Sequence, residues 1–329
     1  MLVKCLFVMS FCFLLAFSIA PLVIKVCQKL KASQTILNYV EAHKSKQGTA
    51  TMGGFIFILA TFCGAFFAFS GSYSYALLSV VVMLAYGTLG FLDDFIKVKM
   101  RQNLGLRAYQ KIIGQVGIAF IIAFFVYNYV GTTIWLPFTN LSVDLGWFII
   151  PFIVVFFLAL VNSVNLIDGL DGLCSGVSIS YLISFSLLLS LFLNLLNGQI
   201  LIETENLIVV CFCLIGSLFA FFVYNGYPAK IFMGDTGSLA IGGFLSAVAV
   251  FSGLELYVVL LGLPYVLTSL SDILQVMYYK KTKKRIFQMA PLHHHFEKKG
   301  FNENKIVIVY SILTLFLGIA FFLIMSLIL

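Results

Sequence analysis

Charged residues are scarce in this sequence of 329 residues, where they make up 10% of the chain while hydrophobic residues make up 61%. A soluble domain of this size carries about a quarter charged residues. So few polar side chains cannot cover a water-soluble globule, and lipid must therefore be the solvent for most of the chain. The composition excludes a soluble fold.

Cysteine pairs with metal-ligand spacing in a polar context are also absent. The seven cysteines lie mostly in apolar runs, and we interpret them as small apolar side chains. No internal repeat or separate soluble domain is evident, so we expect one polytopic membrane domain over residues 1–329.

Ten apolar runs are each about long enough to cross ~30 Å of hydrocarbon as a helix. They lie near 5–27, 51–70, 74–92, 112–131, 147–164, 176–196, 206–225, 237–254, 256–278 and 306–328. The first run resembles a signal peptide, but Pro21 follows the candidate cleavage site and the apolar run continues to Cys27. We expect this run to be retained as a span. The sequence therefore predicts an all-α integral membrane protein with about ten transmembrane helices.

Basic residues fall almost entirely on one side of these spans. Of the 20 Lys and Arg residues, 19 lie in odd-numbered loops, and only Lys4 lies on the other side. The positive-inside rule makes those loops cytoplasmic and both termini extracytoplasmic. This distribution suits anionic membrane lipids and phosphate-bearing ligands, so we expect no nucleic-acid partner despite the net charge of +7.

Acidic residues divide between the two faces. Those in outer loops are expected to be plain solvated charges: Asp144, Glu203, Glu205 and Glu255. Those at the inner face come from four segments: Asp93, Asp94, Asp168, Asp171, Asp235 and Asp272. Ionisable residues are costly in membrane proteins unless they face water or have a function. Their convergence predicts a functional site at the cytoplasmic face.

The first acidic motif is D-D-x-x-K, formed by Asp93, Asp94 and Lys97. If the preceding span continues as a helix, Lys97 lies above the two aspartates and pairs with one of them or with a phosphate. Adjacent carboxylates repel unless a cation such as Mg²⁺ relieves them. The alternative is an ordinary water-facing loop start.

Two further segments are polar directly beside apolar spans. Asn165, Asp168 and Asp171 recur every three residues, which would place them on one face of a helical turn, as a site or as a polar packing seam. Asp235 lies at the expected start of a helix, where it could bind a metal, attract an anion or simply cap the helix.

Three consecutive histidines, His293, His294 and His295, precede the last span. Histidine binds phosphate, donates protons or ligates transition metals. Consecutive histidines on a helix cannot all reach one metal, which makes a zinc site the weaker interpretation. Solvated surface histidines are the remaining alternative.

Taken in order, the motifs D-D-x-x-K, N-x-x-N-x-x-D-G-L-D-G-L, F-M-G-D-T-G-S and P-L-H-H-H-F-E resemble those of the bacterial phospho-N-acetylmuramoyl-pentapeptide transferases. These enzymes belong to the polyprenyl-phosphate N-acetylhexosamine 1-phosphate transferase superfamily. The resemblance runs from about Lys46 to the last span, and the triple histidine is particular to the muramoyl-pentapeptide branch.

The resemblance implies a Mg²⁺-dependent enzyme of the bacterial plasma membrane. It would transfer phospho-N-acetylmuramoyl-pentapeptide from its UDP donor to undecaprenyl phosphate and release UMP. The implied catalytic residues are Asp93, Asp94, Asp235, His293 and His294. The implied substrate contacts are Lys46, Thr51, Lys97, Lys111, Asn165, Asp168, Asp171, Phe232, Gln275 and His295. The implied Mg²⁺ ligands are Asp235 and Asp168, and Asp93 is the candidate base.

Several alternatives stay open at this point. A lipid phosphate with a second pKa near ~6 is mostly dianionic at neutral pH, so direct attack on the β-phosphorus needs no strong base and is favoured over a two-step route through an aspartyl-phosphate. A sister enzyme that uses UDP-N-acetylglucosamine is the nearest rival. A secondary transporter is disfavoured because the acids lie at one end of the spans, not at the midplane. The sequence leaves the oligomeric state, including a homodimer, undecided.

Overall fold

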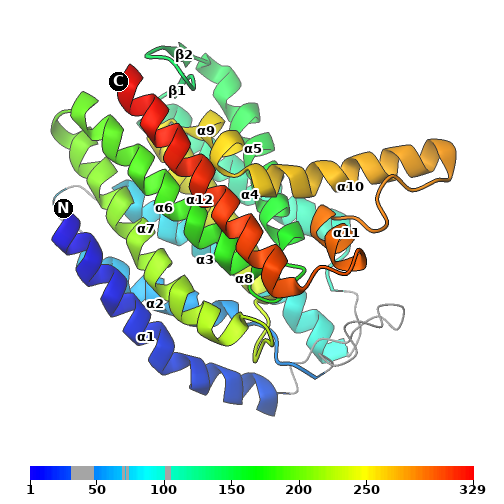
Figure 1. Ribbon diagram of the computed structural model, residues 1–329. Coiled ribbons are helices and arrows are strands. Elements are labelled where there is room, and N and C mark those ends of the chain that lie inside the picture. The colour runs from blue at the N-terminus through cyan, green and yellow to red at the C-terminus, as the bar shows by residue number, and fades with distance from the viewer. Residues whose placement is uncertain (31–47, 69–70, 72–73, 101–104) are drawn as a thin grey trace.

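The computed structural model describes residues 1–30, 48–68, 71, 74–100 and 105–329 (Figure 1). The helices are α1 (Leu2–Lys29), α2 (Gly54–Ala68), α3 (Ser74–Met100), α4 (Ala108–Phe125), η2 (Val126–Val130), η3 (Gly146–Phe148), α5 (Ile149–Ile167), α6 (Leu173–Phe192), η4 (Leu193–Leu195), α7 (Gly198–Asn225), α8 (Gly234–Ser252), α9 (Glu255–Leu261), α10 (Leu263–Thr282), α11 (Leu292–Lys298) and α12 (Glu303–Ile328). The two strands, β1 (Thr133–Trp135) and β2 (Ser142–Asp144), form one antiparallel hairpin.

The helices confirm an all-α architecture with membrane-spanning character. Within the described residues, eight helices are long and apolar enough to cross a membrane, α9 and α10 form one bent pair, and α2 contains a shorter apolar helix. Each of the ten predicted spans overlaps one of these elements. The number of spans that cross the bilayer, however, stays a prediction.

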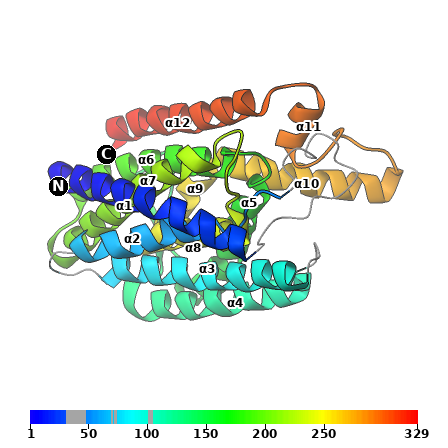
Figure 2. The ribbon, with the colours of Figure 1, turned by 90° about the horizontal axis from the view of Figure 1, so that it is seen from below.

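The predicted span 256–278 is not one straight helix, because the chain bends by 82° between α9 and α10. Gly262 separates the two helices, and Pro264 lies in the first turn of α10. Proline has no backbone N–H and clashes with the preceding turn, so it begins a helix more readily than it continues one. As a result α10 projects away from the bundle and carries the chain toward α11 (Figures 1 and 2).

Helix α8 lies at the centre of the bundle and is buried along nearly its whole length. Small residues let its neighbours come close: Gly54 of α2 packs on Gly237, and Val161 of α5 packs on Gly242. Without a strong hydrophobic drive between helices in lipid, such close packing supplies much of the association energy. The first turn of α8 is thereby held between α2, α3 and α5.

Two outer acids are not the solvated charges that the sequence predicts. Glu203 is only 2% exposed and accepts the backbone N–H groups of Ser74 (3.1 Å) and Tyr75 (2.9 Å), so it caps the start of α3. Glu255, also 2% exposed, begins α9. The first N–H groups of a helix need acceptors, and in an apolar setting a neighbouring side chain supplies them. Asp144, in contrast, is exposed as predicted.

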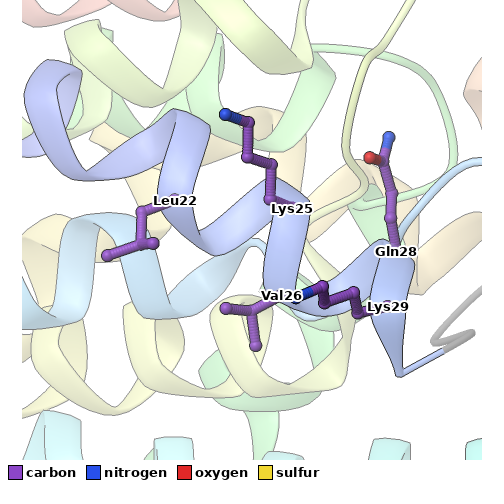
Figure 3. Close-up of a pocket in the computed structure, with 5 residues that line it drawn as sticks. All are labelled: Leu22, Lys25, Val26, Gln28 and Lys29. Atoms are coloured by element: carbon purple, nitrogen blue, oxygen red, sulfur yellow. The ribbon is translucent and has the colours of Figure 1, made fainter.

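The two chain termini lie at the same end of the bundle, and α11 lies at the other (Figure 2). The C-terminal end of α1 also points away from the termini. There Lys25 and Lys29 line a hollow of about 540 Å³ together with Leu22, Val26 and Gln28 (Figure 3). Basic side chains therefore gather at the end of the molecule where α11 lies.

Candidate active site

Three carboxylates meet at the end of the bundle that is away from the termini. Asp93 and Asp94 come from α3, Asp235 comes from the first turn of α8, and one oxygen of each lies within 4.8 Å of the others. Close approach of the two helices depends on Gly90, because a Cβ added there would overlap the backbone carbonyl of Asp235. The prediction that acids converge is confirmed for these three.

Two lysines offset part of the negative charge of the cluster. The Nζ atom of Lys97 lies 2.5 Å from Asp93 Oδ2, 2.9 Å from Asp235 Oδ2 and 3.8 Å from Asp94 Oδ1. Lys111 Nζ lies 3.1 Å from the same Oδ2 of Asp235. As predicted, α3 continues as a helix past Lys97 and places its ammonium group above the aspartates. A site that already holds a cation among three oxygen ligands also suits a hard divalent cation.

Asp94 is bound to the backbone of α8. Its Oδ2 accepts the N–H (2.9 Å) and the hydroxyl (2.7 Å) of Thr236, and its Oδ1 accepts the N–H of Asp235 (3.2 Å). Asp94 therefore caps α8 from a neighbouring helix, whereas Asp235 does not cap its own helix. The Oδ1 atom of Asp93 similarly accepts the N–H of Leu106 at 2.7 Å.

Asn165 orients the third carboxylate. Its Nδ2 donates to Asp235 Oδ1 (2.7 Å) and to Ser238 Oγ (2.8 Å), and its Oδ1 accepts from Lys111 Nζ (3.3 Å). Asp235 thus receives an amide on one oxygen and two ammonium groups on the other. Such contacts favour a fully ionised carboxylate in a defined orientation.

The predicted helical face of Asn165, Asp168 and Asp171 is wrong. Helix α5 ends at Ile167, Asp168 has a non-helical ψ of 54°, and Gly172 has a positive φ of 80°. The residues consequently point to different partners. Asp171 Oδ2 accepts the N–H of Ala229 at 3.0 Å, while Asn165 alone reaches Asp235.

Asp168 lies near the cluster but outside the group of three. Burial raises the pKa of its carboxyl to about 8, and the nearby charges of Asp235 and Asp94 add to the increase. A bound cation would offset this penalty by stabilising the ionised form. Asp272, the sixth predicted acid, lies on α10 and is also not one of the three.

The three histidines lie on α11 and have three different environments. His293 is fully buried, and neither ring nitrogen has a hydrogen-bond partner among the described residues. Burial, reinforced by His294, lowers the pKa of His293 to about 3, which keeps its ring neutral. Nδ1 of His294 pairs with Glu297 Oε2 at 2.8 Å, and Nδ1 of His295 accepts the N–H of Gln288 at 3.1 Å.

Gly169 brings this histidine helix onto the loop after α5. A Cβ added at Gly169 would lie 2.5 Å from Nε2 of His293 and 2.8 Å from Nε2 of His294. Only glycine leaves room for both imidazoles there. The residues 168–172 and α11, which are far apart in sequence, are therefore parts of one site.

Comparison with known proteins can now be set beside this geometry. The model of glycosyl transferase family 4 matches residues 76–253, a range that contains Asp93, Asp94, Asn165 and Asp235. The phospho-N-acetylmuramoyl-pentapeptide-transferase of Clostridium kluyveri is 45% identical over 94% of this chain and 97% of its own. The chain belongs to the phospho-N-acetylmuramoyl-pentapeptide transferases of glycosyl transferase family 4.

Other relatives of the same name give the same result. The enzyme of Thermoanaerobacter sp. (strain X514) is 43% identical over 96% of both chains. That of Clostridium perfringens (strain 13) is 40% identical over 94% of this chain and 95% of its own. The resemblance noted in the sequence motifs is confirmed.

Two of the remaining residues implied by the family, Thr51 and Phe232, lie beside the cluster. Thr51 is buried in the segment 50–54, which pairs with 231–233 through the bonds Phe232 N to Ala50 O (2.8 Å) and Gly53 N to Phe232 O (2.9 Å). This pairing places Thr51 and Phe232 beside the start of α8. Lys46 lies outside the described residues.

Gln275 has a structural contact that the sequence does not suggest. Its Oε1 accepts the N–H groups of Ile286 (3.1 Å) and Phe287 (3.0 Å), and its Nε2 donates to Phe287 O (3.1 Å). The amide therefore holds the loop before α11. Sequence reasoning gave no role to Ser238 and Glu297, although both lie within the quoted motifs, and it missed the buried amide of Gln115, which lies in no motif.

Proposed function

We propose that this protein transfers phospho-N-acetylmuramoyl-pentapeptide from its UDP donor to undecaprenyl phosphate, with release of UMP. The observation that carries the proposal is the buried Asp93–Asp94–Asp235 cluster with its two lysines, at one end of an apolar helical bundle. The names of relatives that are 40–45% identical over nearly the whole chain support the choice of reaction.

The cluster has the character that phosphoryl transfer requires. Catalysis of this reaction depends on positioning and on neutralising charge more than on covalent chemistry. When bound, Mg²⁺ would neutralise the donor diphosphate and polarise its phosphoryl oxygens. We assign Asp93 and Asp235 as the ligands, because their carboxylates face the ammonium group of Lys97 at 2.5 and 2.9 Å, whereas Asp94 is bound to the N–H groups that begin α8. Asp168 stands next to this set as a further ligand.

Lys97 and Lys111 hold positive charge where a diphosphate would arrive. Both lie within 3.1 Å of Asp235 Oδ2, so a phosphate oxygen competes with that carboxylate for their ammonium groups. Asn165 keeps the carboxylate oriented throughout. Phe232, His294 and the loop 168–172 then form the part of the site that contacts uracil, donor phosphates and sugar, and the buried His293 packs against His294.

Direct attack by the lipid phosphate on the β-phosphorus of the donor is the mechanism we favour. The acceptor is mostly dianionic at neutral pH, so its oxygen needs no strong base. Asp93 is held by Lys97 and by the N–H of Leu106, and both contacts fix the orientation of its carboxylate. This environment supports a charge-positioning role for Asp93 more than proton removal.

For the membrane arrangement we propose ten spans, extracytoplasmic termini and a site on the cytoplasmic face of the bacterial plasma membrane. The support is the placement of 19 of the 20 Lys and Arg residues in odd-numbered loops, together with the location of the site opposite the termini (Figure 2).

A donor comparison tests the reaction. Purified protein is given undecaprenyl phosphate with either UDP-N-acetylmuramoyl-pentapeptide or UDP-N-acetylglucosamine, and UMP release is measured. The proposal predicts release with the muramoyl-pentapeptide donor alone. Release with UDP-N-acetylglucosamine alone would assign the sister reaction.

A further inference from the structure

A pair of buried amides lies beneath the acidic cluster and has no role in the proposed chemistry. Nδ2 of Asn162 on α5 donates to Oε1 of Gln115 on α4 at 2.7 Å, and Nε2 of Gln115 faces Oδ1 of Asn162 at 3.4 Å. Gln115 is 0% exposed. Amides in an apolar interior are costly unless they are paired, so a pair of this kind needs a reason.

The pair is the lower of two polar rungs between the same two helices. Lys111 lies one turn before Gln115 on α4, and Asn165 lies one turn after Asn162 on α5. Residues at these spacings share a helix face. The upper rung joins Lys111 to Asn165 at 3.3 Å, and both of its members end on Asp235.

The lower rung also contacts the other two helices of the site. The hydroxyl of Tyr86, two turns before Asp93 on α3, donates to the backbone carbonyl of Gln115 at 3.0 Å. On the opposite side of Tyr86 lies α8, where a Cβ added at Gly243 would be 2.6 Å from the tyrosine ring. The layer formed by Tyr86, Gln115 and Asn162 therefore touches all four helices that carry the acidic cluster, its lysines and Asn165.

We propose that Gln115 and Asn162 are positioning residues for the transfer reaction. They fix the axial position of α4 relative to α5, so that Lys111 and Asn165 both contact the Asp235 carboxylate. Apolar side chains would tolerate sliding between the helices, whereas a paired amide layer has one alignment, as buried polar residues do when they define register in coiled coils. The inference rests on Asp235 belonging to the active site, as proposed above.

A double-mutant cycle between Gln115 and Lys111 tests this role. Gln115→Leu should lower kcat by roughly tenfold to a hundredfold, since a displacement of about 1 Å has that cost, while the donor KM stays within about twofold. If Gln115 acts through Lys111, the double variant with Lys111→Gln should be no more than about threefold slower than the slower single variant. If the losses in kcat of the two single variants instead multiply in the double variant, the proposal is overturned.

The exchange of the two amides provides a rescue. The variant with Gln115→Asn and Asn162→Gln keeps one long and one short amide, and we expect it to restore kcat to within about fivefold of the unsubstituted protein. Failure of the exchange together with a fully active Gln115→Asn single variant would overturn the proposal. The same single variant, which shortens the side chain by one methylene, replaces Gln115→Leu in the cycle if the leucine variant does not fold.

A matched control separates positioning from stability. Thr61 on α2 donates to Ser217 on α7 at 3.0 Å, and both are fully buried, so Thr61→Val also removes an interhelical hydrogen bond. It should lower the midpoint of thermal unfolding and leave kcat unchanged. An equal loss of kcat in Thr61→Val would overturn the proposal. Normal turnover of Asp235→Asn would be a different result, because it would overturn the proposed active site and not only the positioning role of the two amides.

Discussion

The carboxylate of Asp94 shows at the scale of one residue how structure and chemistry divide within an acidic pair. It accepts three hydrogen bonds from the first turn of α8, whereas Asp235, which begins that turn, receives two lysines and an amide. Two aspartates that look alike in the sequence thus have different contacts: Asp94 holds the helix, whereas Asp235 is the one that we propose to face the ligand.

Asp94→Asn should therefore lower stability as well as activity. An amide offers one acceptor oxygen in place of two, and hydrogen bonds to charged groups contribute about 1.5–3 kcal/mol each. We expect the thermal unfolding midpoint in detergent to fall by several degrees and UMP release to be largely lost. The matched variant Asp235→Asn should lose activity with a smaller change in midpoint. Equal midpoints for the two variants would contradict this division.

Gly169 is a second residue whose role we can test, because it lets the loop after α5 contact the histidines of α11. In Gly169→Ala the new Cβ would meet Nε2 of His293 and His294, which displaces α11 and should lower kcat about tenfold or more. Gly117→Ala on α4 is the control, because a Cβ there meets nothing within 4 Å. Turnover assays of both variants should separate them, and a fully active Gly169→Ala would show that the histidine helix needs no close contact with the loop.

His293 gives a dependence of stability on pH. Its folded-state pKa of about 3 lies below the usual value of 6.5, so the unfolded state takes up a proton first as the pH falls. Its contribution to stability is complete above pH 6.5 and declines by at most ~1.4 kcal/mol per pH unit as the pH falls toward 3. Unfolding midpoints measured from pH 7 to pH 4 should fall less steeply in His293→Phe. Parallel curves for the two proteins would contradict the buried neutral ring.

At the scale of secondary-structure elements, the contact between α3 and α8 determines the site. Gly90 and Gly87 both face α8 from α3, but a Cβ at Gly90 would overlap the Asp235 backbone, whereas one at Gly87 would meet the side chain of Ile58 at 3.2 Å and that of Ala240 at 3.3 Å. Backbone cannot move aside as a side-chain end can.

Gly90→Ala should accordingly separate the two helices and disable the cluster. We expect at least a hundredfold loss of UMP release together with a lower unfolding midpoint, by analogy with other overpacked cores, which lose about 1–3 kcal/mol. Gly87→Ala is the matched substitution on the same helix and should be markedly milder in both assays. The account of this contact fails if the two alanine variants behave alike.

How far the sequence predicts these elements depends on whether the cause is local. The helical spacing of Asp93 and Lys97 correctly predicts their ion pair, because α3 continues without a break. The turn after Ile167 breaks the expected face of Asn165 and Asp171, because Gly172 adopts a left-handed conformation and Asp171 binds the distant Ala229. Partners supplied by other helices leave no local pattern.

The same distinction explains the errors at Glu203 and at the break between α9 and α10. The sequence predicts that Glu203 is a solvated loop acid, yet its side chain, which belongs to α7, caps the start of α3. The break between α9 and α10 has a visible cause in Pro264, but hydropathy alone joins the two helices into one span. Pairing between helices is non-local, and no spacing in the sequence encodes it.

At the scale of the whole molecule, an apolar bundle carries both termini at one end and a buried acidic site at the other (Figure 2). A lipid acceptor approaches such a site from the bilayer, while a nucleotide donor approaches from water. In the proposed membrane arrangement, charge neutralisation would occur where these two environments meet, which is what the transfer of a phosphosugar onto a lipid phosphate requires.

The central claim is that Asp235 and Asp93 hold a divalent cation that the transfer reaction needs. The most direct test is UMP release from UDP-N-acetylmuramoyl-pentapeptide and undecaprenyl phosphate, measured across a Mg²⁺ titration with the purified protein and with Asp235→Asn. The account predicts saturable dependence on Mg²⁺, complete loss with a chelator, and turnover of the variant reduced by at least about a thousandfold. Turnover of Asp235→Asn within about tenfold of the unsubstituted protein, at any Mg²⁺ concentration, would contradict it.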